Sequence, residues 1–198
     1  MLPLRKNKAL SLEPSDRLKK LPPYLFVEVD RKKRELRAKG KDVIDLGVGD
    51  PDLPTPDFII EALNEAARDP KNHHYALDGG LPELRETFAR WFSERFRVKL
   101  DPQEEVLPVI GTKEGIAHLP LALLNPGDVA LVPDPCYPVY KSATHLAGAM
   151  PYLLPLLETQ NFLPDYSVVD GEILESAKLL FLNYPNNPTG ACASLEFF

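Results

Sequence analysis

Three short loops contain residues whose types and spacing suit a flat, negatively charged ligand. The first is Gly-Thr-Lys-Glu-Gly at residues 111–115, which opens a predicted helix. Gly111 allows the backbone to turn sharply, Thr112 offers a hydroxyl, and a helix N-terminus directs unpaired N–H groups outward. The loop therefore indicates a seat for a phosphate or a carboxylate. A plain helix cap uses the same residues, and the spacing is not that of a Walker A loop.

The second loop, residues 133–140, reads Pro-Asp-Pro-Cys-Tyr-Pro-Val-Tyr. Its three prolines restrict the backbone, so Tyr137 is held between Cys136 and Pro138. A rigid loop that presents an aromatic ring suits stacking on a planar ligand. The alternative is that Tyr137 and Tyr140 simply pack beneath the loop.

The third loop is Pro-Asn-Asn-Pro-Thr-Gly at residues 185–190, which follows an apolar run. A residue that precedes proline is driven out of the helical region, so Asn187 is either extended or joined to Pro188 by a cis bond. Its amide is then directed by the backbone and can donate a hydrogen bond to a ligand oxygen. The alternative is an Asx-turn that satisfies its own backbone. Two prolines around two asparagines favour the ligand role.

The elements that must position these loops alternate between strand and helix. The arm before residue 48 contains one amphipathic helix that ends near Gly40. After it, hydrophobic periodicity predicts strands over 104–111, 128–134, 150–157 and 177–184, and helices over 54–69, 81–96, 112–124 and 138–149. In the first of these helices, 54–69, Thr55 can cap the helix and Pro56 suits its first turn.

This alternation predicts an α/β fold with three layers, α-β-α, around a mainly parallel sheet that is buried on both faces. Ligands of such sheets bind at the carboxyl ends of the strands. The loops after Ile110, Val132 and Leu182 are therefore the places to expect a site, and they are the three loops described above.

Composition excludes several classes of function. The chain has 198 residues and a net charge of −6, which argues against a nucleic-acid partner. No apolar run approaches membrane-spanning length, and nothing resembles a signal peptide, so we expect a cytoplasmic protein without a membrane partner. Cys136 and Cys192 are too few for a disulfide framework. His73 and His74 are adjacent but have no partner at metal-ligand spacing, so we expect no metal site.

Taken together, five motifs resemble the class I/II aminotransferases, which are pyridoxal-phosphate enzymes of fold type I. The resemblance runs from about Leu21 to the last residue. Residues 21–26, 49–56 and 111–128 are most similar to the LL-diaminopimelate branch of that family. The motifs are LGVGDPD, YALDGGLPELR, GTKEG, PDPCYPVY and PNNPTG.

The resemblance implies a cofactor, pyridoxal 5′-phosphate, and a role for each matching residue. The substrates would be an amino acid and a 2-keto acid, and the full-length form would be a homodimer. The implied roles are phosphate binding by the backbone of Gly111, Thr112 and Lys113, ring stacking by Tyr137, a hydrogen bond from Asn187 to the phenolic oxygen, approach of Gly49 to the substrate carboxylate, and contact of Tyr75 with the phosphate of the neighbouring subunit.

The sequence also departs from the family pattern. The Schiff-base lysine of the family lies downstream of the Pro-Thr-Gly loop, and Lys113, Lys141 and Lys178 do not match its position. No catalytic residue is therefore assigned in this chain. We expect residues 1–50 to be an arm with a small-domain segment and residues 51–198 to be an incomplete large domain, inactive alone.

Two other readings remain open at this stage. The same loops would serve a fold type I lyase or decarboxylase. A non-catalytic module or pseudoenzyme would also keep them. An incomplete sheet leaves an unpaired edge and an uncovered apolar face, so we expect the isolated chain to aggregate or to depend on a partner.

Overall fold

The computed structural model describes residues 13–47, 49, 51–75 and 79–198. The chain divides into two compact units, one formed by the segment up to Pro22 together with Ile110–Phe198, and the other by Pro23–Val109. Each unit is described separately below. The expected division near residue 50 stays a prediction.

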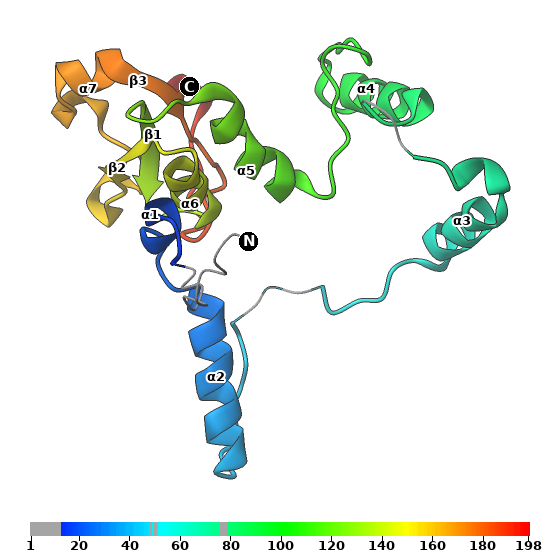
Figure 1. Ribbon diagram of the computed structural model, residues 1–198, viewed down its shortest axis with the longest axis horizontal. Helices are drawn as coiled ribbons and strands as arrows, with labels where there is room; N and C mark the ends of the chain where they lie inside the picture. Colours follow the sequence, from blue (N-terminus) through cyan, green and yellow to red (C-terminus); the bar gives the residue numbers. More distant parts are fainter. Residues whose placement is uncertain (1–12, 48, 50, 76–78) are drawn as a thin grey trace, which may run out of the picture. The chain divides into compact units, whose positions relative to one another are not determined.

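The unit that begins at Ile110 is built on a three-stranded sheet (Figure 1). Its strands are β1, Val129–Asp134, β2, Met150–Pro155, and β3, Ala177–Leu180. The order is β2-β1-β3, and β1 is parallel to both neighbours. The parallel sheet predicted from the alternation of strands and helices is confirmed.

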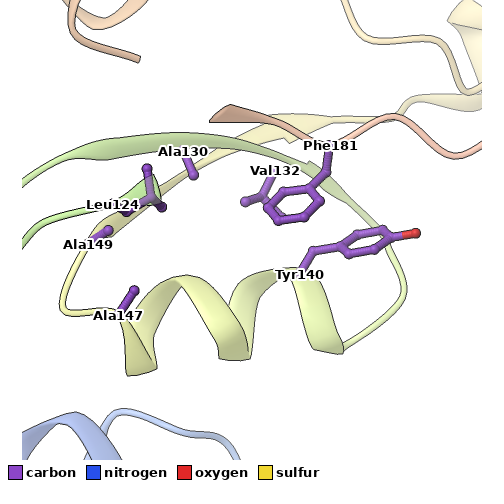
Figure 2. Close-up of a cluster of buried hydrophobic side chains, with 7 residues drawn as sticks. All are labelled: Leu124, Ala130, Val132, Tyr140, Ala147, Ala149 and Phe181. Atoms are coloured by element: carbon purple, nitrogen blue, oxygen red, sulfur yellow. The ribbon is translucent and has the colours of Figure 1, made fainter. Parts of the chain in front are cut away.

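Strand β1 is buried on both faces, as its continuous apolar run predicted. Successive side chains of a strand point to opposite faces, so Ala130 and Val132 join one cluster while Val129 and Leu131 join another. The first cluster includes Phe181 and Tyr140 of helix α6, Val139–Leu146 (Figure 2). The second receives Ile173 of helix α7, Gly171–Ser176. The sheet therefore carries helical segments on both faces, as expected for an α/β fold.

The helices of this unit largely match the predicted ranges. Helix α5 spans Thr112–Leu123 and helix α6 spans Val139–Leu146. Pro120 lies inside α5 and is buried. The short segments were not predicted. They are α1, Asp16–Lys19, α7, Gly171–Ser176, and the 3-10 turns Glu158–Gln160, Tyr166–Val168 and Leu195–Phe197.

Strand β3 is shorter than the predicted 177–184, and its pairing with β1 contains an irregularity near its start. Ala177 pairs with Val129 and Leu179 pairs with Ala130, which leaves Lys178 as an extra residue. The Lys178 ammonium lies 2.9 Å from the Asp128 carboxylate. Beyond Leu180 one further ladder bond forms, from Phe181 N–H to the carbonyl of Leu131 at 3.0 Å.

The strand predicted over 104–111 is wrong. None of these residues pairs with a strand in the part of the chain that the structure describes. Pro108 has no N–H to donate to a ladder, and its ring instead packs against Gly80. Ile110 is 94% exposed. Apolar β-branched residues favoured a strand here, but a strand forms only when it has a hydrogen-bonding neighbour.

The second unit contains three helices, α2, Leu25–Ala38, α3, Asp57–Arg68, and α4, Pro82–Phe96, and one 3-10 turn, Pro70–Asn72. The helix expected to end near Gly40 is confirmed as α2. Helix α3 begins one residue later than the capping argument implied. Pro56 occupies the N-cap position, no side-chain cap forms there among the described residues, and the predicted Thr55 cap is therefore wrong.

We predict that Leu154→Ala lowers the free energy of unfolding by about 3 kcal/mol, because it leaves a cavity in the core. Leu154 lies in β2 and is 1% exposed. The matched control Leu157→Ala changes a leucine that is 51% exposed and should cost less than about 0.5 kcal/mol. Urea unfolding of both variants measures the difference. Equal losses would contradict the placement of the core at β2.

Candidate functional site

The first predicted loop forms an open turn at the start of α5. Gly111 occupies the N-cap with φ +77°, a conformation that favours glycine, and a side chain there would meet open space. Gly111, Thr112 and Lys113 are all exposed. The Glu114 carboxylate accepts a hydrogen bond from Ile110 N–H at 2.6 Å and so steadies the chain as it enters the helix. The backbone of this turn is accessible to a ligand, which is what an anion seat requires.

The second loop lies beside the first. The Lys113 ammonium is 5.9 Å from the centre of the Tyr137 ring, within the range of a cation–π contact. Tyr137 is half-buried and meets the ring of Tyr140 edge-on, with centroids 5.8 Å apart. Tyr140 packs in the core, and Tyr137 rests on it while keeping part of its surface exposed. The stacking of Tyr137 on a planar ligand stays a prediction.

The stack continues from Tyr140 to the strand that leads into the third loop. Tyr140 and Phe181 are nearly parallel, with ring centroids 4.7 Å apart, as Figure 2 shows. Phe181 follows β3 directly and is buried. Because β1 and β3 are adjacent parallel strands, the loops that follow them leave from the same end of the sheet.

The third loop is a turn closed by its own hydrogen bonds. Asn187 and Pro188 are joined by a cis peptide bond, one of the two conformations that the sequence allowed. Asn187 is exposed, and its side-chain amide makes no hydrogen bond to any residue within the described ranges. Its backbone N–H donates to the Asn183 side chain at 3.0 Å. The side chain is thus not used in an Asx-turn of its own.

The other two predicted residues, Gly49 and Tyr75, belong to the unit of residues 23–109. Gly49 is exposed, and a side chain placed there would meet open space. Tyr75 is 95% exposed. Parts of the motifs around them, Val48, Asp50 and residues 76–78, lie outside the described residues. The roles expected for Gly49 and Tyr75 stay predictions.

Sequence reasoning missed several residues that shape the site. Asn183, Asn186 and Thr189 hold the third loop through side-chain hydrogen bonds, and Glu114 holds the first. The signal that could have found them is polarity at the end of an apolar strand. A buried asparagine has to find partners, and the nearest ones are in the same turn.

Burial also changes the chemistry of Cys136, which precedes Tyr137. Loss of solvent, reinforced by the negative charge of Asp134, raises the pKa of the Cys136 thiol to about 11. Both effects disfavour the thiolate, so this cysteine remains a neutral thiol at physiological pH. It acts as a small apolar residue that packs against the same cluster as Tyr137.

The chain is thus an α/β protein with an exposed helix start, a partly exposed aromatic ring beside it and an exposed amide on a third loop. Comparison with known families makes the assignment specific. The Aminotransferase class I and II family matches residues 41–198. The chain belongs to this family.

Relatives of this chain include members of the expected branch. The chain is 56% identical over 184 residues to an LL-diaminopimelate aminotransferase of Syntrophobacter fumaroxidans and 55% identical to one of Aquifex aeolicus. Each match covers 93% of this chain, and 47% and 48% of the respective relatives. The chain therefore spans about half the length of the curated relatives it matches.

Solved structures confirm the fold. The chain resembles BacF of Bacillus subtilis with a TM-score of 0.86 and 46% identity, over 95% of this chain and 48% of that protein. An aspartate aminotransferase of Thermus thermophilus gives a TM-score of 0.85 at 33% identity, over 94% and 48% of the two chains.

Among the residues that the structure describes, no helix has the length and apolar character needed to cross a membrane.

We predict that Cys136 reacts far more slowly with a thiol reagent than an ordinary cysteine does. A pKa of about 11 leaves a small thiolate fraction at pH 8, and the labelling rate should rise about tenfold for each pH unit below that value. The measurement uses two single-cysteine variants, Cys192→Ser, which retains Cys136, and Cys136→Ser, which retains the exposed Cys192. Equal labelling rates at pH 8 would contradict the buried, neutral thiol.

Proposed function

We propose that this chain carries the pyridoxal-phosphate site of an enzyme that transfers an amino group between an amino acid and a 2-keto acid. The single observation that supports this most strongly is the contact between Lys113 and Tyr137, which brings the anion seat and the aromatic ring together. Membership of the aminotransferase family supports the same conclusion.

The residues present fit such a cofactor. The backbone at Gly111 is open because a Cβ there would meet nothing, so a phosphate can approach it closely. Thr112 adds a hydroxyl, and Lys113 adds positive charge. Tyr137 offers part of its ring surface for stacking. The exposed amide of Asn187 can donate to a ring oxygen.

Each of these residues has a task that follows from its place. The α5 N-terminus would anchor the phosphate through backbone N–H groups and the helix dipole. Tyr137 would set the plane of the ring, and Asn187 would hold the phenolic side. When bound, the pyridine ring supplies an electron sink for carbanions at the amino-acid Cα. The chain's own residues bind and orient; they do not include an assigned catalytic residue.

The substrates and assembly state are inferred from relatives. The relatives named LL-diaminopimelate aminotransferase suggest an amino donor of the diaminopimelate type, with a 2-keto acid as its counterpart. We also propose that the full-length form is a homodimer in which Tyr75 reaches the phosphate of the neighbouring subunit. The exposure of Tyr75 leaves its hydroxyl available for such a contact.

We predict that the chain binds pyridoxamine 5′-phosphate, which needs no covalent lysine, and that Tyr137→Ala and Asn187→Ala each weaken this binding by about 5- to 20-fold. The losses correspond to a ring contact and a hydrogen bond of about 1 to 2 kcal/mol each. Fluorescence titration measures the affinities. Asn64→Ala, which changes an exposed asparagine of α3, is the matched control and should leave affinity unchanged. Unaltered binding in both site variants would exclude this site.

We predict that the chain alone does not transfer amino groups, and that activity appears when it is combined with the remaining half of the Syntrophobacter relative. The reason is that the covalent lysine of the family has no counterpart in this chain. Coupled assay of keto-acid formation from LL-diaminopimelate measures the activity. The same partner half without its covalent lysine is the control. Activity of this chain by itself, or failure of the halves to associate, would contradict the proposal.

A further inference from the structure

The turn that presents Asn187 is held by an internal network of hydrogen bonds centred on Asn186. Asn186 is 4% exposed. Its backbone N–H donates to the carbonyl of Ala191 at 2.8 Å, and its carbonyl accepts from Gly190 N–H at 2.7 Å. Its side-chain oxygen accepts twice from Thr189, from the hydroxyl at 2.8 Å and from the backbone N–H at 3.2 Å. The turn is therefore closed on itself from residue 186 to residue 191.

A second side chain fixes Asn187 itself. The Asn183 side-chain oxygen accepts a hydrogen bond from the backbone N–H of Asn187 at 3.0 Å. Asn183 lies just beyond β3 and is half-buried. The bond ties the exposed residue directly to the chain that leaves the sheet. The backbone of Asn187 is thus held by its own hydrogen bond to Asn183. It is also held by the hydrogen bonds between Asn186 and Thr189, which flank it in the sequence.

One polar side chain of this turn, that of Asn187, takes no part in these hydrogen bonds. The side-chain oxygens of three residues, Asn183, Asn186 and Thr189, take part in hydrogen bonds within the turn. The Asn187 amide is exposed and makes no hydrogen bond to a residue that the structure describes. A turn that needed only to reverse the chain would not require a third side-chain amide. The network fixes the backbone of Asn187 and leaves its side chain for a ligand.

We propose that Asn183 and Asn186 are positioning residues that hold the Asn187 amide ready for the phenolic oxygen of a pyridine cofactor. The inference rests on the proposed function. Its physical basis is preorganisation: an amide whose backbone is already fixed loses less conformational freedom when it binds, so more of its hydrogen-bond energy appears as affinity. Asn183 and Asn186 do not touch the ligand in this account. They act through Asn187.

The test compares two ligands that differ only at the phenolic oxygen, pyridoxamine 5′-phosphate and its 3-deoxy analogue. The 198-residue chain should bind the first about tenfold more tightly, which is the effect of one hydrogen bond. Asn187→Ala should abolish this preference. Asn183→Ala and Thr189→Val should reduce it to about twofold or less, because each removes one member of the network that fixes Asn187.

Conservative variants separate positioning from general damage. Asn183→Asp keeps an acceptor oxygen and Thr189→Ser keeps the hydroxyl, so both should retain the tenfold preference. Binding of inorganic phosphate, which the α5 turn would hold, should be unchanged in every variant. Asn64→Ala, on the exposed surface of α3, is the matched asparagine control.

Three results would overturn the inference. The first is a full preference in Asn183→Ala and Thr189→Val. The second is a loss of phosphate binding in those variants, since the residues would then support the whole fold rather than Asn187. The third is an absent preference in the unaltered chain that still binds both ligands, because Asn187 would then not meet the phenolic oxygen. Failure of the unaltered chain to bind either ligand would instead refute the proposed function, and this inference with it.

Discussion

The structure depends on the burial of β1 between two apolar layers. Alternate side chains of this strand enter two different clusters, so a shift of one residue would exchange the two faces and empty both clusters. Its parallel neighbours β2 and β3 are aligned on it through hydrogen bonds. Once β1 is fixed, the starting points of the loops that leave β1 and β3 are fixed as well. Two residues of the proposed site, Tyr137 and Asn187, lie in those loops.

The three loops are held in shape by three different means. The α5 turn relies on a glycine backbone and on Glu114, which binds the preceding N–H. Tyr137 is supported by packing, since it rests on Tyr140, which stacks in turn on Phe181. The loop of Asn187 is held by hydrogen bonds. In each loop, the group that would touch a planar, charged ligand is at least partly exposed. The residues that hold that group in place are buried or hydrogen-bonded.

Large apolar side chains remain exposed elsewhere in the chain. Phe58 of α3 is 71% exposed, and no residue of that helix is buried. Surfaces of this kind mark places where other protein covers the molecule, because apolar area left in water is unfavourable. The chain spans about half the length of its relatives, and the exposure agrees with that match. The unpaired segment around Pro108 has the same character: a sequence suited to a strand, without a neighbour within the described residues.

Much of the fold could be predicted from the sequence because it follows local rules. Helical periodicity placed α2, α4, α5 and α6, and the apolar run of residues 129–133 required a strand buried on both faces. The motifs also identified Gly111, Tyr137 and Asn187 as candidates, since glycine permits backbone conformations that other residues avoid and proline restricts the residues beside it. The prediction that failed was the strand over 104–111. These residues have the propensity for a strand, but a strand also requires a hydrogen-bonded neighbour.

Only the tertiary structure decided which residues meet. The contact of Lys113 with Tyr137 joins two segments that are 24 residues apart (137 − 113), and no local pattern predicts it. The support that Asn186 and Asn183 give to Asn187 depends on which asparagine is buried, and neighbouring asparagines look alike in a sequence. Residue type and spacing therefore determined what each loop could do. Packing determined which side chains support the fold and which stay exposed.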